Sequence, residues 1–135
     1  MKTTTTWKHG EVFEAEMEGI RVPLDGNRKE GFSPKWILLS SLAACSGIDI
    51  VDILTKMRVT FSDLVIDTEA GQTEEHPRVF QDITITYRIT TAEENREKIN
   101  KAITLSLDKY CGVAAMLRKN SNINYELDIR TTLKP

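Results

Sequence analysis

The sequence predicts an α+β protein folded as one domain over residues 1–135. A long and mostly apolar stretch, residues 33–58, has the composition of a buried helix. Runs in which apolar and polar residues alternate stand on both sides of it, as in half-buried strands. The resulting order of strands, helix, hairpin, helices and a final strand is typical of the α+β class, and the length suffices for one hydrophobic core.

The strands before the long helix are short. Residues 3–7 are largely β-branched and are expected to form an edge strand. Residues 13–17 alternate apolar side chains with glutamates, and residues 20–24 alternate again, which predicts two further strands. Pro23 cannot donate a hydrogen bond to a neighbouring strand, so this third strand is expected to lie at a sheet edge or to end at Pro23.

Ser33 and Pro34 are the expected N-cap and first residue of the long helix, because the fixed φ of proline suits that position. From Trp36 to Ala44 every side is apolar or small, which predicts a helix enclosed by other structure. Charged residues interrupt the apolar run, so we expect it not to span a bilayer. A thin set of strands cannot cover this much apolar surface, which favours a partner chain in a two-fold dimer.

The chain beyond residue 58 returns to strands. Residues 64–69 and 80–90 alternate and are expected to pair as a long antiparallel hairpin. Thr91 followed by Glu94 has the spacing of a capping box at the start of a second helix. We expect Gly112 to interrupt that helical region.

Two elements complete the predicted fold. Residues 113–119 are expected to form a short helix, and residues 125–129 alternate as a last strand.

Composition and charge exclude several classes of partner. The formal net charge of −2 gives no reason to expect nucleic acid or an anionic membrane. No apolar segment follows the first two residues, so no signal peptide is expected. Two cysteines without an export signal suggest the reducing cytoplasm, where such thiols are redox-active or simply buried.

Cys45 and Cys111 are the candidate reactive groups. Small residues flank both of them in helix-forming sequence, which would let two helices approach and bring the sulfurs within disulfide range. Cys111 at a helix start would feel the positive end of the helix dipole, which lowers a thiol pKa. The alternative is two inert buried thiols, because a free cysteine behaves as a small hydrophobic residue.

Other candidate groups have weaker support. Asp49 lies one helical turn after Cys45, where a carboxylate would raise the thiol pKa and oppose reactivity. His9 and His76 combine with the cysteines into no set with zinc-ligand spacing, so no metal is expected. Both histidines fall in predicted loops, which argues against a cysteine–histidine hydrolase.

Three motifs stand in order along the chain. The first cysteine motif comprises Ser33-Pro34, Leu38-Leu39, Leu42-Ala43-Ala44-Cys45, Ile48-Asp49 and Ile53 to Arg58. A hairpin follows with His76 to Phe80, Ile83, Ile85 and Tyr87, and the second cysteine motif comprises Ala102, Leu105-Ser106, Lys109-Tyr110-Cys111 and Val113. With these motifs the sequence resembles the OsmC/Ohr family, named for osmotically inducible protein C and the organic hydroperoxide resistance protein. The resemblance extends in order from about residue 7 to residue 129.

This resemblance implies a fold and a chemistry. Family members are intertwined homodimers in which two antiparallel β-sheets wrap around the long central helices, with active sites at the interface. Carried over, Cys45 is the thiol that attacks a hydroperoxide and becomes a sulfenic acid, and Cys111 resolves it to a disulfide. An external dithiol restores both thiols without a metal or organic cofactor, and apolar walls would favour organic hydroperoxides.

One departure from the family pattern concerns the charges that activate the first thiol. The well-studied peroxidases carry a glutamate directly after the proline, paired with an arginine from the early strands, whereas this chain has Lys35. The first turn of this chain offers Lys8 and His9 in that region, whereas the candidate arginines, Arg21 and Arg28, fall later in the sequence. Ten helical residues place Lys35 ~15 Å along the axis from Cys45, so it would act only on the thiol of a partner chain.

Three functions therefore remain open, and all require the same fold. The first is a thiol peroxidase using Cys45 and Cys111. The second is a non-enzymatic dimer that binds a small apolar or thiol-bearing ligand in the interface cleft. The third is a thiol–disulfide redox protein that does not turn over peroxide.

Overall fold

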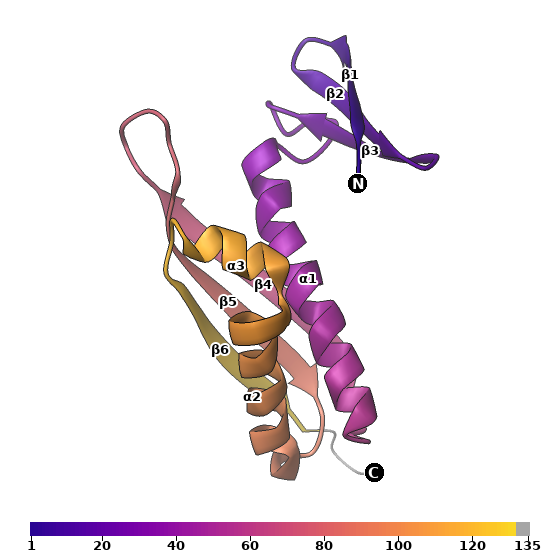
Figure 1. Ribbon diagram of the computed structural model, residues 1–135, viewed down its shortest axis with the longest axis vertical. Helices are drawn as coiled ribbons and strands as arrows, with labels where there is room; N and C mark the ends of the chain where they lie inside the picture. Colours follow the sequence, from indigo (N-terminus) through magenta and orange to yellow (C-terminus); the bar gives the residue numbers. More distant parts are fainter. Residues whose placement is uncertain (132–135) are drawn as a thin grey trace. The chain divides into compact units, whose positions relative to one another are not determined.

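A computed structural model describes residues 1–131 of the chain and shows the α+β class that the sequence predicts (Figure 1). The chain divides into two compact units, Met1–Ser40 and the part that begins at Ser41. The helices and strands are, in order, β1 (Thr4–His9), β2 (Val12–Met17), β3 (Ile20–Asp25), α1 (Pro34–Lys56), β4 (Ser62–Gln72), β5 (Phe80–Thr90), η1 (Glu93–Asn95), α2 (Arg96–Leu105), η2 (Ser106–Tyr110), α3 (Gly112–Arg118) and β6 (Ile123–Arg130).

The first unit holds a three-stranded antiparallel sheet in the order β1-β2-β3. Phe13 of β2 stands opposite Trp7 on one side and Leu24 on the other. Pro23 lies in β3, which is an edge strand as the sequence predicts, so its missing N–H breaks no pairing on the outer side.

The loop between β3 and α1 is organised by the buried carboxylate of Asp25. Its oxygens accept hydrogen bonds from the backbone N–H groups of Asn27, Lys29 and Glu30 at 2.8, 3.1 and 3.0 Å. These donors hold the pKa of Asp25 below its ordinary value. The loop returns against β3 because the Asp25 N–H donates to the Phe32 carbonyl, which brings the chain to the start of α1.

The second unit holds a three-stranded sheet in the order β4-β5-β6. β4 and β5 form the expected antiparallel hairpin, but β6 runs parallel to β5. The expectation of antiparallel sheets is therefore wrong for this last strand. α2 and α3 lie between β5 and β6 in the sequence, and such a helical crossover returns the chain in the same direction.

The core of the second unit lies on one face of this sheet. Alternate residues of β5 are almost fully buried, and so are residues of α1 and α2: Ile83, Ile85, Tyr87, Ile89, Leu42, Ile50, Leu54, Ile99, Ala102 and Ile103. Figure 1 shows α2 and α3 in front of the sheet. A buried hydrogen bond between Ser46 of α1 and Tyr87 of β5 places the second half of α1 on the same face.

Helix α1 is less enclosed by its own chain than its sequence predicts. Its buried residues are Leu42, Ser46, Gly47, Ile50 and Leu54, whereas the side chains of Ile48 and Val51 are 64% and 40% exposed. By length and composition alone, α1 is the one helix of residues 1–131 that could cross a membrane, contrary to our sequence expectation. Core helices of soluble proteins share these properties, and the second half of α1 packs on the sheet as such a helix.

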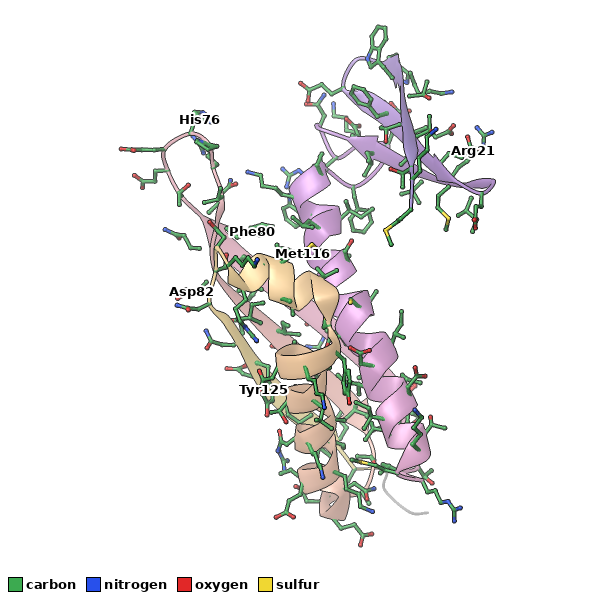
Figure 2. The ribbon with its side chains drawn as sticks, viewed as in Figure 1. Arg21, His76, Phe80, Asp82, Met116 and Tyr125 are labelled. Atoms are coloured by element: carbon green, nitrogen blue, oxygen red, sulfur yellow. The ribbon has the colours of Figure 1, made fainter. Side chains whose placement is uncertain are left out.

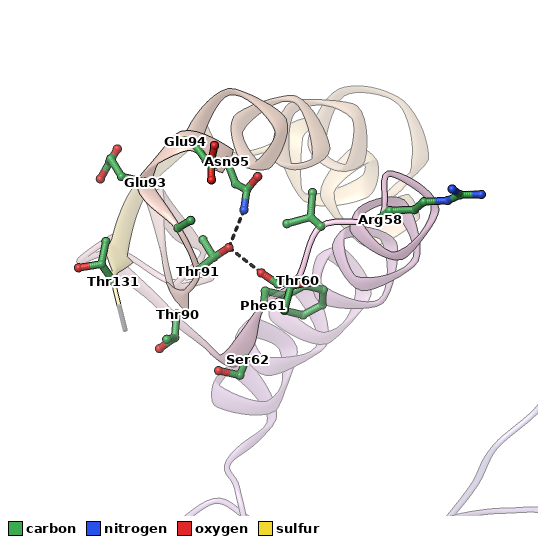
Figure 3. Close-up of a pocket in the computed structure, with 12 residues that line it drawn as sticks. Arg58, Thr60, Phe61, Ser62, Thr90, Thr91, Glu93, Glu94, Asn95 and Thr131 are labelled. Carbon is green, nitrogen blue, oxygen red and sulfur yellow. Dashed lines mark hydrogen bonds between the residues drawn. The ribbon is translucent and has the colours of Figure 1, made fainter. Parts of the chain in front are cut away.

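The predicted capping box at Thr91 and Glu94 does not form. The N-cap of the first helical turn is Ala92, with no side-chain hydrogen bond. The Thr91 hydroxyl instead donates to the Thr60 carbonyl at 2.7 Å and accepts a hydrogen bond from the Asn95 amide at 3.0 Å (Figure 3). Thr91 therefore ties the end of β5 to the segment that precedes β4.

Candidate functional site

Cys45 lies half-buried near the middle of α1. The next two residues, Ser46 and Gly47, are buried, and a Cβ added to Gly47 would stand 3.0 Å from the Ile66 side chain of β4. These small residues allow α1 to approach the sheet closely, which fixes the face of the helix that carries Cys45. Cys45 is thereby held at the margin of the core as a partly exposed residue.

Cys111 lies where two helical segments meet. Residues Ser106–Tyr110 form a single turn of π-helix, closed by a hydrogen bond of 2.7 Å from the Cys111 N–H to the Ser106 carbonyl. Cys111 then serves as the N-cap of α3, with its Sγ accepting a hydrogen bond from the Ala114 N–H at 3.3 Å. Such isolated π-turns occur frequently at functional sites. Only 3% of Cys111 is exposed.

The structure brings the two cysteines together. Their side chains share a hydrogen bond, and both are free thiols. The two residues are far apart in the sequence and come from α1 and the α2–α3 junction, so the fold creates this pair. The pair consists of one partly exposed cysteine, Cys45, and one buried cysteine, Cys111.

The pKa of Cys111 is raised from its ordinary value of 9.0 to about 11. Burial is the largest cause, followed by the hydrogen bond with Cys45, and the charge of Asp49 adds to them. The Ala114 N–H acts in the opposite direction but is outweighed. The sequence expectation of a lowered pKa at this helix start is therefore wrong, because desolvation exceeds the effect of one backbone donor.

Beside the thiols, a chain of polar groups runs through the core. Ser106 Oγ lies 2.9 Å from Asp49 Oδ2 and 3.1 Å from Ser46 Oγ. Ser46 Oγ lies 2.6 Å from the Tyr87 hydroxyl. Both serines have no exposed surface, and Tyr87 is 1% exposed. This chain, the Asp49–Tyr87 chain, connects α1, the π-turn and β5 within one unit.

Sequence reasoning identified Asp49 but missed the other three members of the Asp49–Tyr87 chain. Ser46 and Ser106 each stand on the buried side of a helical segment, and a serine there is a signal for a buried hydrogen-bond partner. Tyr87 occupies one of the inward positions of β5, where its hydroxyl also needs a partner. Which serine meets which partner depends on tertiary packing.

Burial raises the pKa of Tyr87 to about 12, and the hydrogen bond with Ser46 opposes this only in part. Tyr87 therefore stays protonated and able to donate. Its ring packs edge-on against Tyr125 of β6 with centroids 6.1 Å apart, and the Tyr125 hydroxyl donates to Asn100 of α2 at 2.9 Å. These contacts hold the β5 end of the Asp49–Tyr87 chain in one place.

The basic residues proposed from sequence all lie in the first unit. Arg21, labelled in Figure 2, forms ion pairs with Glu14 at 2.8 Å and Glu16 at 3.7 Å on the same sheet. The guanidinium of Arg28 lies 5.1 Å from the ring centroid of Trp36. Lys35 belongs to the first turn of α1. The charges of Arg21 and Arg28 are thus engaged with residues of their own unit.

Neither histidine is placed as a catalytic partner. His9 lies 3.5 Å from Glu30 in the first unit. His76 stands on the exposed loop between β4 and β5, as Figure 2 shows. Within residues 1–131, no three or more His, Cys, Asp or Glu side chains gather as a set that could hold a metal ion.

A separate pocket of about 640 Å³ opens at the end of α1 (Figure 3). Its lining comes from residues 58–62, 90–95 and 131 and combines polar and apolar surface. Neither cysteine contributes to it. Its two central polar groups, Thr91 and Asn95, bond to each other and to the Thr60 carbonyl, so they have structural roles.

The chain is thus an α+β protein in which a half-buried helix cysteine, Cys45, meets a buried N-cap cysteine, Cys111. The model of the OsmC-like protein family matches residues 25–126, and the chain belongs to that family. Protein YhfA of Escherichia coli strain K12 is 32% identical over 131 residues, covering 96% of this chain and 98% of YhfA.

Solved structures agree with this assignment. A hypothetical protein from Aquifex aeolicus VF5 has a TM-score of 0.87 and 25% identity, covering 98% of this chain and 97% of its own. The organic hydroperoxide resistance protein OhrB of Bacillus subtilis has a TM-score of 0.64 and 17% identity, covering 95% and 98% of the two chains. At that identity the likeness to OhrB concerns the fold.

Proposed function

We propose that this protein is a two-cysteine thiol peroxidase that reduces organic hydroperoxides. The observation that carries the proposal is the hydrogen-bonded pair of an accessible Cys45 and a covered Cys111 on neighbouring elements. An attacking thiol must meet its substrate, whereas a resolving thiol need only meet the first sulfur. The two exposures match that division of roles.

The proposed reaction has three steps: peroxide reduction, disulfide formation and reduction of the disulfide. The Cys45 thiolate attacks one peroxide oxygen, the O–O bond breaks, and the leaving alkoxide takes a proton to become an alcohol while Cys45 becomes a sulfenic acid. Cys111 attacks the sulfenic sulfur, the S–O bond breaks, and the proton of Cys111 leaves with the hydroxyl group as water. An external dithiol then reduces the Cys45–Cys111 disulfide by exchange and is itself oxidised to a disulfide.

Further parts of the proposal come from the family resemblance. The protein works as a homodimer in the cytoplasm, with active sites at the subunit interface and no resident cofactor. The exposed apolar residues of α1, among them Ile48 and Val51, support a partner surface. The name of OhrB, an organic hydroperoxide resistance protein on the same fold, supports the substrate class.

The test follows peroxide and thiols together. Reduced protein is mixed with cumene hydroperoxide, and peroxide loss and free thiols are measured for wild type, Cys45→Ser and Cys111→Ser. We expect wild type to consume peroxide and lose both thiols, Cys45→Ser to consume none, and Cys111→Ser to hold a sulfenic acid that dimedone traps. Intact peroxide together with fully titratable thiols would contradict the proposal and favour a non-enzymatic binding protein.

Thiol–disulfide exchange without peroxide turnover is the second candidate function. The same thiol pair supports it, and so does Lys35, which stands where the well-studied peroxidases of the resembled family carry a glutamate. In the same assay this function predicts intact peroxide but formation of the Cys45–Cys111 disulfide when an oxidised dithiol is added. A peroxidase loses its thiols to the hydroperoxide, whereas a thiol–disulfide exchange protein loses them only to the oxidised dithiol.

A further inference from the structure

The shared hydrogen bond of the two thiols has a direction. Two thiols at contact distance hold two protons, and when one proton leaves, the remaining one lies between the sulfurs. Cys111 is the covered partner and Cys45 the accessible one, so solvent favours the charge on Cys45. The remaining proton then stays on Cys111, and Cys111 S–H donates to the Cys45 thiolate.

Ser106 is the residue of the Asp49–Tyr87 chain that fixes Asp49. A carboxylate accepts hydrogen bonds, and the Ser106 hydroxyl donates to Asp49 Oδ2 at 2.9 Å. The same hydroxyl faces Ser46 Oγ as a donor at 3.1 Å, and Ser46 Oγ shares a hydrogen bond of 2.6 Å with the Tyr87 hydroxyl. Ser106 is thus held against two residues of α1, Asp49 and Ser46.

Ser106 has a second consequence for Cys111, because it begins the π-turn that carries this cysteine. The Ser106 carbonyl accepts from the Cys111 N–H, while its hydroxyl is fixed to α1. Asp49 on α1 is therefore linked through one residue to the backbone of Cys111. The same helix also supplies Cys45. The hydrogen bond of Cys111 with Cys45 and its link through Ser106 to Asp49 therefore both lead to α1.

The titratable groups that act on Cys111 come from two elements. α1 contributes Cys45 and Asp49, and β5 contributes Tyr87. Tyr87 is neutral over the working range of a thiol, which leaves the Cys45 thiolate and the Asp49 carboxylate as the charges that act on Cys111. A negative charge favours the protonated form of a nearby thiol. The raised pKa of Cys111 agrees with this placement of the proton.

We propose that Cys111 has a second role as the hydrogen-bond donor that stabilises the Cys45 thiolate, and that Asp49, fixed by Ser106, is the positioning residue that retains the proton on Cys111. This inference rests on the proposed function for the identity of the attacking sulfur. It supplies a stabilising group for the thiolate in a chain whose residue 35 is a lysine instead of the family glutamate. After attack, the same proton leaves with the sulfenic hydroxyl as water.

The first experiment measures Cys45 without any peroxide. The rate of alkylation by iodoacetamide is followed against pH in Cys111→Ser, whose hydroxyl can donate, and in Cys111→Ala, which cannot. We expect Cys45 of Cys111→Ala to react about tenfold more slowly near neutral pH than Cys45 of Cys111→Ser, which corresponds to a midpoint about one pH unit higher. Equal profiles in the two variants would overturn the donor role.

The second experiment measures Cys111 in a Cys45→Ser background. Asp49→Asn removes the charge but keeps an oxygen that can accept from Ser106, and Asp52→Asn removes an exposed charge from the same helix as a control. We expect Asp49→Asn to lower the alkylation midpoint of Cys111 and Asp52→Asn to leave it unchanged. The same midpoint in both variants would overturn the role of Asp49, and circular dichroism verifies folding.

These measurements separate this inference from the proposed function. Alkylation profiles that follow the expected order in a protein that leaves cumene hydroperoxide intact would support the proton placement while refuting the peroxidase. Peroxide turnover with identical profiles in Cys111→Ser and Cys111→Ala would do the reverse.

Discussion

At Cys111, burial and a backbone donor act in opposite directions on one thiol. The Ala114 N–H favours a thiolate, while burial, Cys45 and Asp49 favour the thiol, and the balance raises the pKa to about 11. A seven-residue helix such as α3 offers little dipole beyond that single donor. Burial decides the protonation of Cys111, which is therefore a neutral thiol near pH 7.

A raised thiol pKa makes the stability of the fold depend on pH. Between the ordinary pKa of 9.0 and about 11, the unfolded chain loses the Cys111 proton while the folded chain keeps it. The stabilisation from this group is complete below pH 9.0 and is lost as the pH rises toward 11. Urea unfolding under reducing conditions should therefore show stability falling over this range.

The matched variant for this prediction is Cys111→Ala, which removes the titrating group. Tyr87 contributes a similar loss between pH 10.0 and about 12 in both proteins, because its pKa is also raised. We expect the wild-type curve to fall more steeply than the variant curve above pH 9.0. Parallel curves would show that Cys111 titrates alike in the folded and unfolded chains.

Two substitutions in the Asp49–Tyr87 chain should differ in cost. Tyr87→Phe removes one partner of Ser46, whose oxygen still accepts from Ser106, so the loss is about 1 kcal/mol. Ser46→Ala leaves the Tyr87 hydroxyl without its partner, which costs about 1–3 kcal/mol. Midpoints of urea unfolding measure both. A larger loss for Tyr87→Phe than for Ser46→Ala would contradict this expectation.

Sequence reasoning reached some of the site residues for physical reasons. Cys45, Cys111 and Asp49 carry chemistry that is visible in the residue type, and Asp49 follows Cys45 at helical spacing. Ser46 and Ser106 resemble ordinary small residues of helices, since their role arises only when α1 and the π-turn meet.

At the scale of elements, the start of α2 depends on tertiary contacts instead of a local cap. Thr91→Val should cost about 1–3 kcal/mol, because the Thr60 carbonyl and the Asn95 amide both lose a partner. Glu94→Gln should change the free energy of unfolding by less than about 0.5 kcal/mol, since Glu94 is exposed and the first helical turn has no side-chain cap. Thermal unfolding measures the stability of both variants. Equal losses of stability would support the capping box that the sequence predicts.

Two glycines test how closely neighbouring segments approach. A Cβ at Gly31 would lie 2.4 Å from the Pro23 carbonyl oxygen, whereas a Cβ at Gly112 meets nothing within 4 Å. We expect Gly31→Ala to destabilise the first unit by about 1–3 kcal/mol, because backbone atoms must move. Gly112→Ala should be neutral or stabilise by up to about 1 kcal/mol. Thermal unfolding measures both variants, and a Gly31→Ala protein as stable as wild type would contradict this expectation.

Periodicity identified most elements, because one buried face leaves a clear pattern in each of them. The inward residues of β5 alternate as the sequence indicates, and the buried stripe of α2 has helical spacing. The parallel pairing of β6 was not predictable in this way, since its residues alternate equally in either direction. The π-turn was also missed, because one additional residue in a helix leaves no periodic signal.

At the scale of the whole molecule, α1 has more apolar surface than its own chain covers. Ile48 is 64% exposed and Val51 is 40% exposed, one helical turn apart on a helix with a buried opposite face. Contiguous apolar exposure on a helix marks an interaction surface. The partner chain expected from the sequence would cover this exposed apolar surface of α1. The oligomeric state in solution tests that expectation.

A negative charge at Ile48 tests the proposed homodimer directly. Ile48→Glu would place a carboxylate in an apolar interface without a partner, so we expect the dissociation constant of the dimer to rise by at least about tenfold. Thr104→Glu is the matched control, since it adds the same charge at an exposed β-branched position of α2. Light scattering during size-exclusion chromatography should show wild type and Thr104→Glu at twice the chain mass of 15.3 kDa, with Ile48→Glu shifting toward the single chain. A monomeric wild type, or an Ile48→Glu variant that remains as dimeric as the control, would place this face of α1 outside any subunit interface.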